Sequence, residues 1–239
     1  MKALVLKNAN SVFSYQDVPD PSPNEGEAVA KVLACGSGLT IQHVKAGRIK
    51  VDFPIILGHE IIAEIVECRG DCGNLKVGMP VTAFFYLTCG YCKWCRINRE
   101  TLCTNFKGYI GRQINGGYAE YISLPAKNYI PIPESIDYKN EPVETAVICD
   151  AIATPLKVMK KARISHADKV GVIGAGGGLG IHMIKMLNLN NVTSVAIETK
   201  SNKKQTCLSE GASLYLSPEK NDFHEVIMDF TKNSGLDVV

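Results

Sequence analysis

The sequence lacks three features that would place it in a common class of protein. No window reaches the roughly 18 consecutive apolar residues of a membrane span, and no signal peptide opens the chain. Neither sign of charge is in large excess, since the sequence has 26 Lys and Arg residues and 24 Asp and Glu residues. Internal repeats and low-complexity tracts are also absent. We therefore expect a globular protein that binds neither membranes nor nucleic acid.

Cysteine, in contrast, is abundant: the 239 residues include nine. Four of them lie in the stretch C-G-Y-C-K-W-C-R-I-N-R-E-T-L-C, namely Cys89, Cys92, Cys95 and Cys103. A loop this short can gather four thiolates around one metal ion, and a closed Zn²⁺ site that only stabilises the loop is the favoured interpretation. An iron–sulfur cluster uses similar spacing and is the main alternative. Disulfides fit poorly, because the first three cysteines are too regularly spaced to pair.

Further candidate metal ligands lie outside this loop. Cys35 is found in V-L-A-C-G-S-G-L-T, His59 and Glu60 in P-I-I-L-G-H-E-I-I, and Asp150 in A-V-I-C-D-A-I-A-T-P. Taken singly, such residues are usually structural: a lone Cys is a small core residue, and an Asp before a helix is a cap. Their order and sequence context give them more weight.

The chain resembles the zinc-dependent medium-chain alcohol dehydrogenases from Met1 to its last residue. The resemblance rests on M-K-A-L-V-L, C-G-S, L-G-H-E, the four-cysteine loop, G-G-Y-A-E-Y and a glycine-rich turn before a helix. It implies a second, catalytic zinc held by Cys35, His59 and Asp150, with Cys149 as the alternative third ligand. The fourth position stays open for water or a substrate oxygen. A zinc ion there acts as a Lewis acid and lowers the pKa of a bound alcohol.

The same resemblance implies roles for three polar residues near Cys35 and His59. Ser37 is expected to bond the substrate oxygen, and Glu60 either approaches the metal during ligand exchange or orients one of its ligands. Thr40 stands where relatives carry a proton-relaying His, and a hydroxyl can pass a proton but cannot store it. His43, one helical turn further on, either replaces that His or is an ordinary surface residue.

A second half begins near Lys169 with the order strand, glycine turn, helix. K-V-G-V-I is followed by G-A-G-G-G-L-G and then by I-H-M-I-K-M-L-N-L, which has helical apolar spacing. This context predicts that a dinucleotide pyrophosphate binds at the helix N-terminus. Leu179 occupies the sixth position of the usual motif, so the essential glycines are Gly174, Gly177 or Gly178, and Gly180. The predicted cofactor-binding residues are Thr154, Gly174, Gly176, Gly177, Gly178, Leu179, Gly180, Glu198 and Lys203.

An acidic residue suggests which dinucleotide binds. S-V-A-I-E ends in Glu198 about 20 residues after the turn, where a carboxylate accepts hydrogen bonds from the adenosine ribose. A 2′-phosphate would be repelled there, so NAD is favoured over NADP. Lys200, Lys203 and Lys204 follow, and they either help to accommodate a 2′-phosphate or form a solvated helix face. The resemblance implies that Lys203 touches the ribose and that Thr154 lies beside the nicotinamide.

The two halves predict two domains of different fold class. Residues 1–148 contain short β runs broken by Gly, Pro and Asn, which predicts a β-barrel domain that the resemblance identifies as GroES-like and zinc-binding. Residues 149–239 predict a leading helix and a partial Rossmann domain, an α/β doubly wound parallel sheet. Ala63 and Arg69 stand where relatives carry glycine. Because Arg with positive φ would be strained, we expect a differently shaped turn after Cys68.

These observations predict an oxidoreductase that moves a hydride between an alcohol or polyol and NAD. The alternatives are a zinc-independent quinone or enoyl reductase of the same superfamily and a non-catalytic zinc-binding fragment. The sequence stops at the start of a fourth parallel strand, whereas a doubly wound fold has about six, so we expect a fragment or a truncated product without turnover of its own. The resemblance implies a small alcohol as substrate and a homo-oligomer for a full-length member. The cysteine content fits a reducing cytoplasm.

Overall fold

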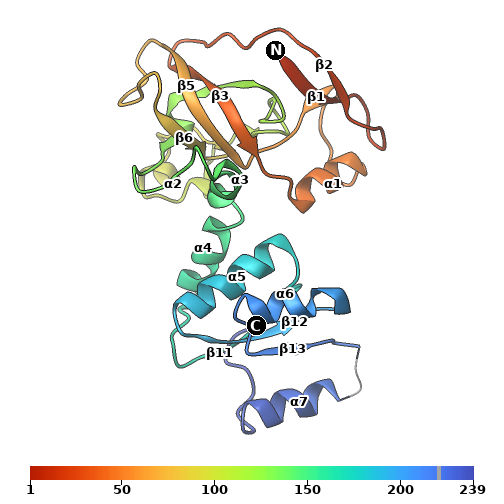
Figure 1. Ribbon diagram of the computed structural model, residues 1–239. Coiled ribbons are helices and arrows are strands. Elements are labelled where there is room, and N and C mark those ends of the chain that lie inside the picture. Colours follow the sequence, from red (N-terminus) through yellow and green to blue (C-terminus); the bar gives the residue numbers. More distant parts are fainter. Residues whose placement is uncertain (220–221) are drawn as a thin grey trace. The chain divides into compact units, whose positions relative to one another are not determined.

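The computed structural model describes residues 1–219 and 222–239 and divides into two compact units, Met1–Cys149 and Asp150–Val239 (Figure 1). The strands of the first unit are β1 Lys2–Leu6, β2 Ser14–Asp17, β3 Glu27–Cys35, β4 Ile55–Ile56, β5 Ile61–Arg69, β6 Pro80–Ala83, β7 Tyr86–Leu87, β8 Gly108–Tyr109, β9 Tyr121–Pro125 and β10 Tyr129–Pro131. Its helices are α1 Leu39–Lys45, α2 Lys93–Arg96 and α3 Pro142–Ala146, with 3₁₀ turns η1 Glu100–Leu102, η2 Ala126–Asn128 and η3 Val147–Cys149. The second unit contains α4 Ala153–Ala162, β11 Lys169–Ile173, α5 Gly178–Leu189, β12 Thr193–Ile197, η4 Ser201–Lys203, α6 Lys204–Ser209, β13 Leu214–Leu216 and α7 Phe223–Phe230.

A five-stranded antiparallel sheet in the order β10-β6-β5-β3-β9 forms the core of the first unit. The long strands β3 and β5 pair along their whole length, with register shifts between Val29 and Ala30 and between Val32 and Ala34. Such irregularities bend and twist a strand pair, which helps the sheet to curve. A second sheet, β2-β1-β4, joins through a bridge between Ala3 and Ala119. This unit is the β-barrel that the short β runs predict.

The turn after β5 shows how the chain does without glycine at position 69. Arg69 is the last residue of β5 and pairs with Glu27, so its backbone is extended. Gly70 takes the left-handed conformation instead, with φ of 68°. The Arg69 guanidinium donates to the carbonyl oxygen of Pro23 at 3.1 Å. The residue with positive φ in this turn is therefore Gly70, and Arg69 carries no backbone strain.

The second unit is built on a parallel sheet in the order β11-β12-β13. Helix α5 buries Ile184 and Leu187 completely in the core of this unit. The last residues of the sequence lie beside β11. The Gly171 amide donates to the carbonyl oxygen of Val238 at 2.8 Å, next to a parallel bridge between Val170 and Val238. Since β12 occupies one edge of β11, Val238 lies at the other edge. This is the strand order of the first half of a doubly wound Rossmann sheet.

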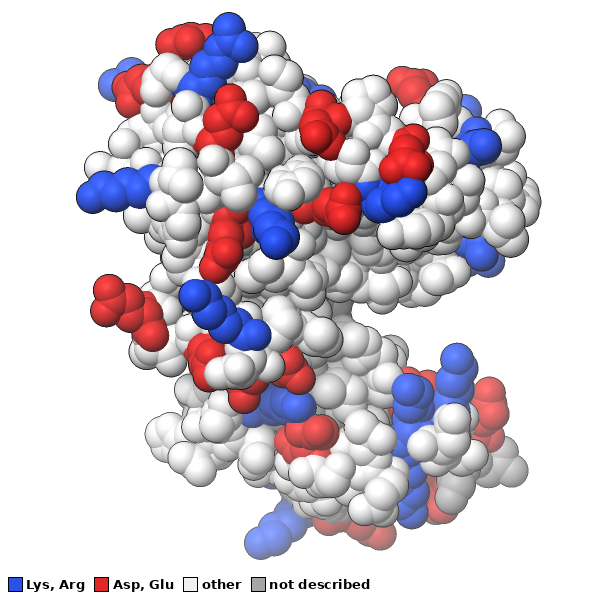
Figure 2. Space-filling view, turned by 45° about the horizontal axis from the view of Figure 1, so that its top comes forward, with Lys and Arg blue, Asp and Glu red and all other residues white. Residues whose placement is uncertain are grey.

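Charge on the surface is mixed. On the face that Figure 2 shows, Lys and Arg side chains alternate with Asp and Glu, and wide areas between them carry neither. This mixture agrees with the formal net charge of +2. Among the described residues, no helix has both the length and the apolar character that crossing a membrane requires.

Candidate active site and metal centres

The four cysteines of the loop converge on one point. Their sulfur atoms all lie within 4.8 Å of one another, and the separations include 3.5 Å for Cys92–Cys95, 3.6 Å for Cys89–Cys103 and 4.0 Å for both Cys89–Cys95 and Cys92–Cys103. A tetrahedron of sulfurs about 2.3 Å from a central Zn²⁺ has edges of about 3.8 Å. The observed separations therefore fit a zinc ion and are far longer than a disulfide bond.

Backbone geometry prepares these thiols to bind a cation. The loop runs between β7 and β8, and the short helix α2 carries Cys95 into the interior. Backbone amides of Cys95 and Thr104 donate to the Cys92 sulfur and lower the pKa of Cys92 to about 5. Burial raises the pKa of Cys95 to about 11. A metal ion would bring all four to the thiolate form, which is the form that binds metal.

The register of the barrel strands brings the segments that carry Cys35, His59 and Glu60 next to one another. Cys35 is the last residue of β3 and pairs with Ile61, the first residue of β5. His59 and Glu60 directly precede β5, so the pairing places them beside Cys35. The Gly36 amide donates to the carbonyl oxygen of Glu60 at 2.7 Å and fixes this corner. His59 and Glu60 are 8% and 5% exposed, and titratable residues are seldom so deeply buried unless they are paired.

Two glycines pack closely against the Cys35 thiol, where a side chain would not fit. A β-carbon at Gly58 would lie 2.6 Å from the Cys35 Sγ, and one at Gly117 would lie 3.1 Å from it. Burial raises the pKa of this thiol, and the neighbouring Cys149 and Glu60 raise it further. A metal cation would offset all of these effects by stabilising the thiolate. The soft sulfur of Cys35 and the imidazole of His59 are ligand types that suit Zn²⁺.

Two neighbouring residues compete as the third ligand of such a site. Cys149 ends η3 in the first unit, and its Sγ lies 3.6 Å from the carbonyl oxygen of His59. Asp150 is the first residue of the second unit, and its Oδ1 accepts a hydrogen bond from the Thr154 hydroxyl at 2.7 Å. A carboxylate keeps a second oxygen for a metal when one oxygen accepts a hydrogen bond. Asp150 and Cys149 both stay predictions as the third ligand.

The polar residues expected to serve the reaction follow Cys35. Ser37 is exposed, whereas Thr40 lies half-buried in the first turn of α1. His43 lies further along α1, and its Nδ1 is 3.2 Å from the Arg48 guanidinium. Because Arg can only donate, the His43 Nδ1 accepts this bond. Their roles in proton transfer stay predictions.

Tyr118 is a site residue that the sequence reasoning missed. Its hydroxyl donates to the carbonyl oxygen of Gly36 at 3.2 Å. Burial raises the pKa of Tyr118, the Ser37 hydroxyl lowers it, and Cys35 and Glu60 raise it again. The G-G-Y-A-E-Y motif was the available signal, since a tyrosine after two glycines can approach the backbone closely.

Aromatic rings pack against the imidazole of His59. The Phe85 ring centroid lies 4.9 Å from that of His59, and the cluster continues through Tyr86, Tyr109 and Phe106 with centroid separations of 4.8–6.4 Å. These rings lie on and beside β7 and β8, the strands that hold the four-cysteine loop. They form an aromatic wall that extends from His59 along β7 and β8, and the only sequence signal for it was the F-F-Y run before Cys89.

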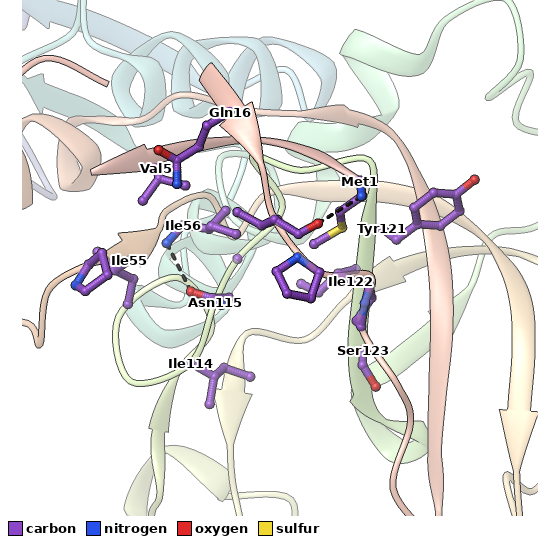
Figure 3. Close-up of a pocket in the computed structure, with 15 residues that line it drawn as sticks. Met1, Val5, Gln16, Ile55, Ile56, Ile114, Asn115, Tyr121, Ile122 and Ser123 are labelled. Atoms are coloured by element: carbon purple, nitrogen blue, oxygen red, sulfur yellow. Dashed lines mark hydrogen bonds between the residues drawn. The ribbon is translucent and has the colours of Figure 1, made fainter. Parts of the chain in front are cut away.

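One apolar cavity of the first unit is separate from these ligands. It has a volume of about 490 Å³ and includes none of Cys35, Ser37 or His59 among its lining residues (Figure 3). At its wall the Ile56 amide donates to the Asn115 side chain at 3.1 Å. Tyr121 stands at its edge, and Figure 3 shows the Tyr121 hydroxyl pointing away from the other labelled side chains. The cavity is therefore no part of the candidate metal site.

The glycine turn of the second unit is shaped by close approaches. Gly174 has φ of 70°, and a β-carbon at Gly180 would lie 2.4 Å from the Gly174 carbonyl oxygen. A β-carbon at Gly177 would lie 3.2 Å from that same oxygen, whereas one at Gly178 would meet nothing within 4 Å. Gly177 is thus the constrained residue of the pair. Leu179, in the first turn of α5, is 50% exposed.

Glu198 joins the end of β12 to this turn. Its Oε2 accepts from the Gly176 amide at 3.0 Å and its Oε1 from the Lys200 amide at 3.1 Å. These two hydrogen bonds hold the pKa of the Glu198 carboxyl below its usual value, and the bond from the Lys200 amide has the larger effect on it. The Lys203 side chain packs so closely over Gly176 that a β-carbon there would lie 2.7 Å from it. The structure thus brings Glu198, Lys203 and the glycine turn together, and it places Thr154 in α4.

Comparisons with known proteins agree with this geometry. The model of the alcohol dehydrogenase GroES-like domain matches residues 24–134. An alcohol dehydrogenase of Geobacillus stearothermophilus is 32% identical over 96% of this chain and 67% of its own length. A thermostable alcohol dehydrogenase of Pyrobaculum aerophilum, solved with cobalt and zinc, superimposes with a TM-score of 0.83 at 27% identity, over 95% of this chain and 67% of that one.

A third relative is a dehydrogenase of Sinorhizobium meliloti described as zinc-binding, whose structure holds NADP. It has a TM-score of 0.82 and 28% identity, over 95% of this chain and 64% of its own. The chain thus spans about two-thirds of the length of the relatives that it matches. With its GroES-like barrel, partial Rossmann sheet and cysteine loop, the chain belongs to the zinc-dependent medium-chain alcohol dehydrogenase family, a family of oxidoreductases.

Proposed function

We propose that the protein acts as a zinc-dependent oxidoreductase that transfers a hydride between an alcohol or polyol and NAD. One observation supports the proposal: Cys35 at the end of β3 pairs with Ile61, so it lies next to the segment that carries His59 and Glu60. In the oxidative direction the alcohol carbon gives a hydride to the nicotinamide, and the alcohol oxygen gives a proton to solvent. The products are a ketone or aldehyde, NADH and a proton.

Each residue of the corner has a part in this proposal. Cys35, His59 and Asp150 would hold the catalytic zinc, and the four-cysteine loop would hold a second, structural one. The catalytic zinc would supply Lewis acidity, which would lower the pKa of the alcohol. Ser37 accepts the hydrogen bond of the alcohol hydroxyl, and Thr40 passes the proton toward solvent. Glu60, which is almost completely buried, orients the ligands from within.

The aromatic wall suggests how water is kept from the corner. The Phe85 ring packs against the His59 ring, and apolar surface at this point favours the carbon skeleton of a substrate over water. Excluding water strengthens every electrostatic interaction at the site. We infer that the substrate is a small alcohol or polyol, with its hydroxyl toward Ser37.

The second unit is proposed to bind NAD. Glu198 and Lys203 flank Gly176, so the adenosine ribose would meet a carboxylate and a lysine at the glycine turn. The amides at the start of α5 would face the pyrophosphate. A 2′-phosphate would be repelled by Glu198, and we therefore favour NAD over the NADP found in one relative. Thr154 is proposed to lie beside the nicotinamide.

Cobalt spectroscopy tests the proposal without requiring turnover. The purified chain is loaded with Co²⁺, which replaces zinc and absorbs visible light, and is titrated with 2-propanol. We expect the alcohol to change the absorption of one of two cobalt ions. The change should vanish in His59→Ala and persist in Cys95→Ser, because only His59 belongs to the open site. A spectrum that no alcohol changes would contradict the proposed function.

A further inference from the structure

The chain that follows β12 folds back on the Glu198 carboxylate. The Glu198 Oε1 accepts hydrogen bonds from the Lys200 amide at 3.1 Å and from the Thr199 hydroxyl at 3.3 Å. The Glu198 Oε2 accepts from the Gly176 amide at 3.0 Å. Donors from the glycine turn and from the segment after β12 therefore hold a long side chain that would otherwise change rotamer freely.

Tyr215 anchors this segment from the neighbouring strand. It lies in β13 and pairs with Ala196 of β12. The Tyr215 hydroxyl lies 3.1 Å from the carbonyl oxygen of Glu198 and 3.0 Å from that of Lys200. Because carbonyl oxygens can only accept, the single proton of the hydroxyl is shared between them. The hydroxyl thus links both ends of the segment 198–200.

The same segment is bonded further on both sides. The Glu198 amide donates to the carbonyl oxygen of Leu216 in β13 at 3.0 Å. The Lys200 carbonyl oxygen accepts from the Lys203 amide at 2.9 Å, which closes the 3₁₀ turn η4. The Tyr215 hydroxyl therefore anchors the backbone between Glu198 and Lys203, the two residues proposed to meet the adenosine ribose.

A fixed carboxylate matters for the choice between NAD and NADP. Repulsion by Glu198 rejects a 2′-phosphate only while the carboxylate cannot turn away from it. A carboxylate free in solvent turns at little cost, whereas one that accepts these hydrogen bonds must break them first. A contact that keeps the Lys200 amide in place therefore strengthens the preference for NAD.

We propose that Tyr215 is a positioning residue that holds the Glu198 carboxylate in place and thereby sets the preference for NAD over NADP. The inference rests on the proposed function, because it concerns how that cofactor site discriminates. Tyr215 bonds the backbone in this account and does not touch the cofactor.

Amide hydrogen exchange, followed by NMR, tests the positioning whether or not a dinucleotide binds. Tyr215→Phe removes the hydroxyl and keeps the ring, which packs against the core of the second unit. The Lys200 and Lys203 amides should exchange about two- to tenfold faster in this variant, the size of one lost neutral hydrogen bond. Ser209→Ala is the matched control, since the Ser209 hydroxyl donates to the carbonyl oxygen of Thr206 at 3.0 Å, outside this segment. Unchanged exchange at both amides in Tyr215→Phe would overturn the inference.

The second arm measures the affinities for NADH and NADPH by fluorescence titration. Tyr215→Phe should lower the ratio of NADH affinity to NADPH affinity about two- to tenfold, because the carboxylate can then turn away from the 2′-phosphate. In a Glu198→Ala background the same change should leave the ratio unaltered, because Tyr215 acts on the preference only through that carboxylate. Ser209→Ala should keep the ratio of the unmodified chain.

The outcomes separate positioning from a general structural effect. A merely structural Tyr215 would weaken the binding of both dinucleotides alike in Tyr215→Phe, and an unchanged ratio would make the inference wrong. Effects of Tyr215→Phe and Glu198→Ala that add in the ratio would do the same. If the unmodified chain binds neither dinucleotide, the proposed cofactor is wrong and the specificity role falls with it, whereas the exchange rates still decide whether Tyr215 holds the segment.

Discussion

Gly58→Ala should displace Cys35 and remove the open metal site while the barrel remains folded. Gly58 has φ of 96°, which a residue with a β-carbon rarely adopts, and that β-carbon would lie 2.6 Å from the Cys35 Sγ and 2.7 Å from Tyr118. The backbone strain costs about 1 to 2 kcal/mol and the overpacking about 1 to 3 kcal/mol. Together they amount to about 2 to 5 kcal/mol, or a melting temperature lower by roughly 4 to 20 °C.

Gly73→Ala provides the matched control. Gly73 also has a positive φ, of 62°, but a β-carbon there would meet nothing within 4 Å. It should therefore cost only the backbone strain of about 1 to 2 kcal/mol. Thermal unfolding and elemental analysis of both variants separate the effects. We expect Gly73→Ala to hold two zinc ions and Gly58→Ala to hold one. A Gly58→Ala protein that keeps two zinc ions and has the same melting temperature as Gly73→Ala would refute the reasoning.

Five other substitutions probe the remaining metal ligands and the cofactor-binding carboxylate. Cys95→Ser should release the structural zinc and lower the melting temperature, because a lost ligand removes folding free energy; metal analysis and thermal unfolding measure both. His59→Ala should lose the other zinc and shift the melting temperature far less than Cys95→Ser does. Asp150→Asn should weaken the open site tenfold or more in a zinc competition titration, while Cys149→Ser should not; the reverse order would make Cys149 the third ligand. Glu198→Ala should narrow the preference for NADH over NADPH in fluorescence titrations, and equal binding of both by the unmodified chain would disprove the role of Glu198.

Local sequence signals predicted much of the fold and one metal-ligand group. The four cysteines lie within 15 residues, so their spacing alone limits how far apart they can fold. The strand, glycine turn and helix around Gly174 are also local, and β11 and α5 form where the apolar pattern places them. Glu198 was identifiable because the distance along one βαβ unit is nearly constant. In each case, the residues that interact are close in sequence or fixed by a known unit.

Contacts across the barrel were beyond the sequence reasoning. Tyr118 reaches Gly36 because its backbone pairs with Leu57 and Leu4, and no local pattern specifies those pairings. The sequence also left open whether Gly177 or Gly178 must be glycine. The structure distinguishes them, because only a β-carbon at Gly177 would crowd the turn. The sequence did not show that Gly70 would carry the positive φ of this turn. That depends on the pairing of Arg69 with Glu27, which keeps Arg69 inside β5.

The central claim is that this chain contains two independent zinc sites, one closed by four cysteines and one open beside Cys35 and His59. Elemental analysis of the purified chain, prepared without added metal and freed of loosely bound ions, tests it most directly. The account predicts two zinc ions per chain. One zinc ion per chain, or iron in place of zinc, would contradict it.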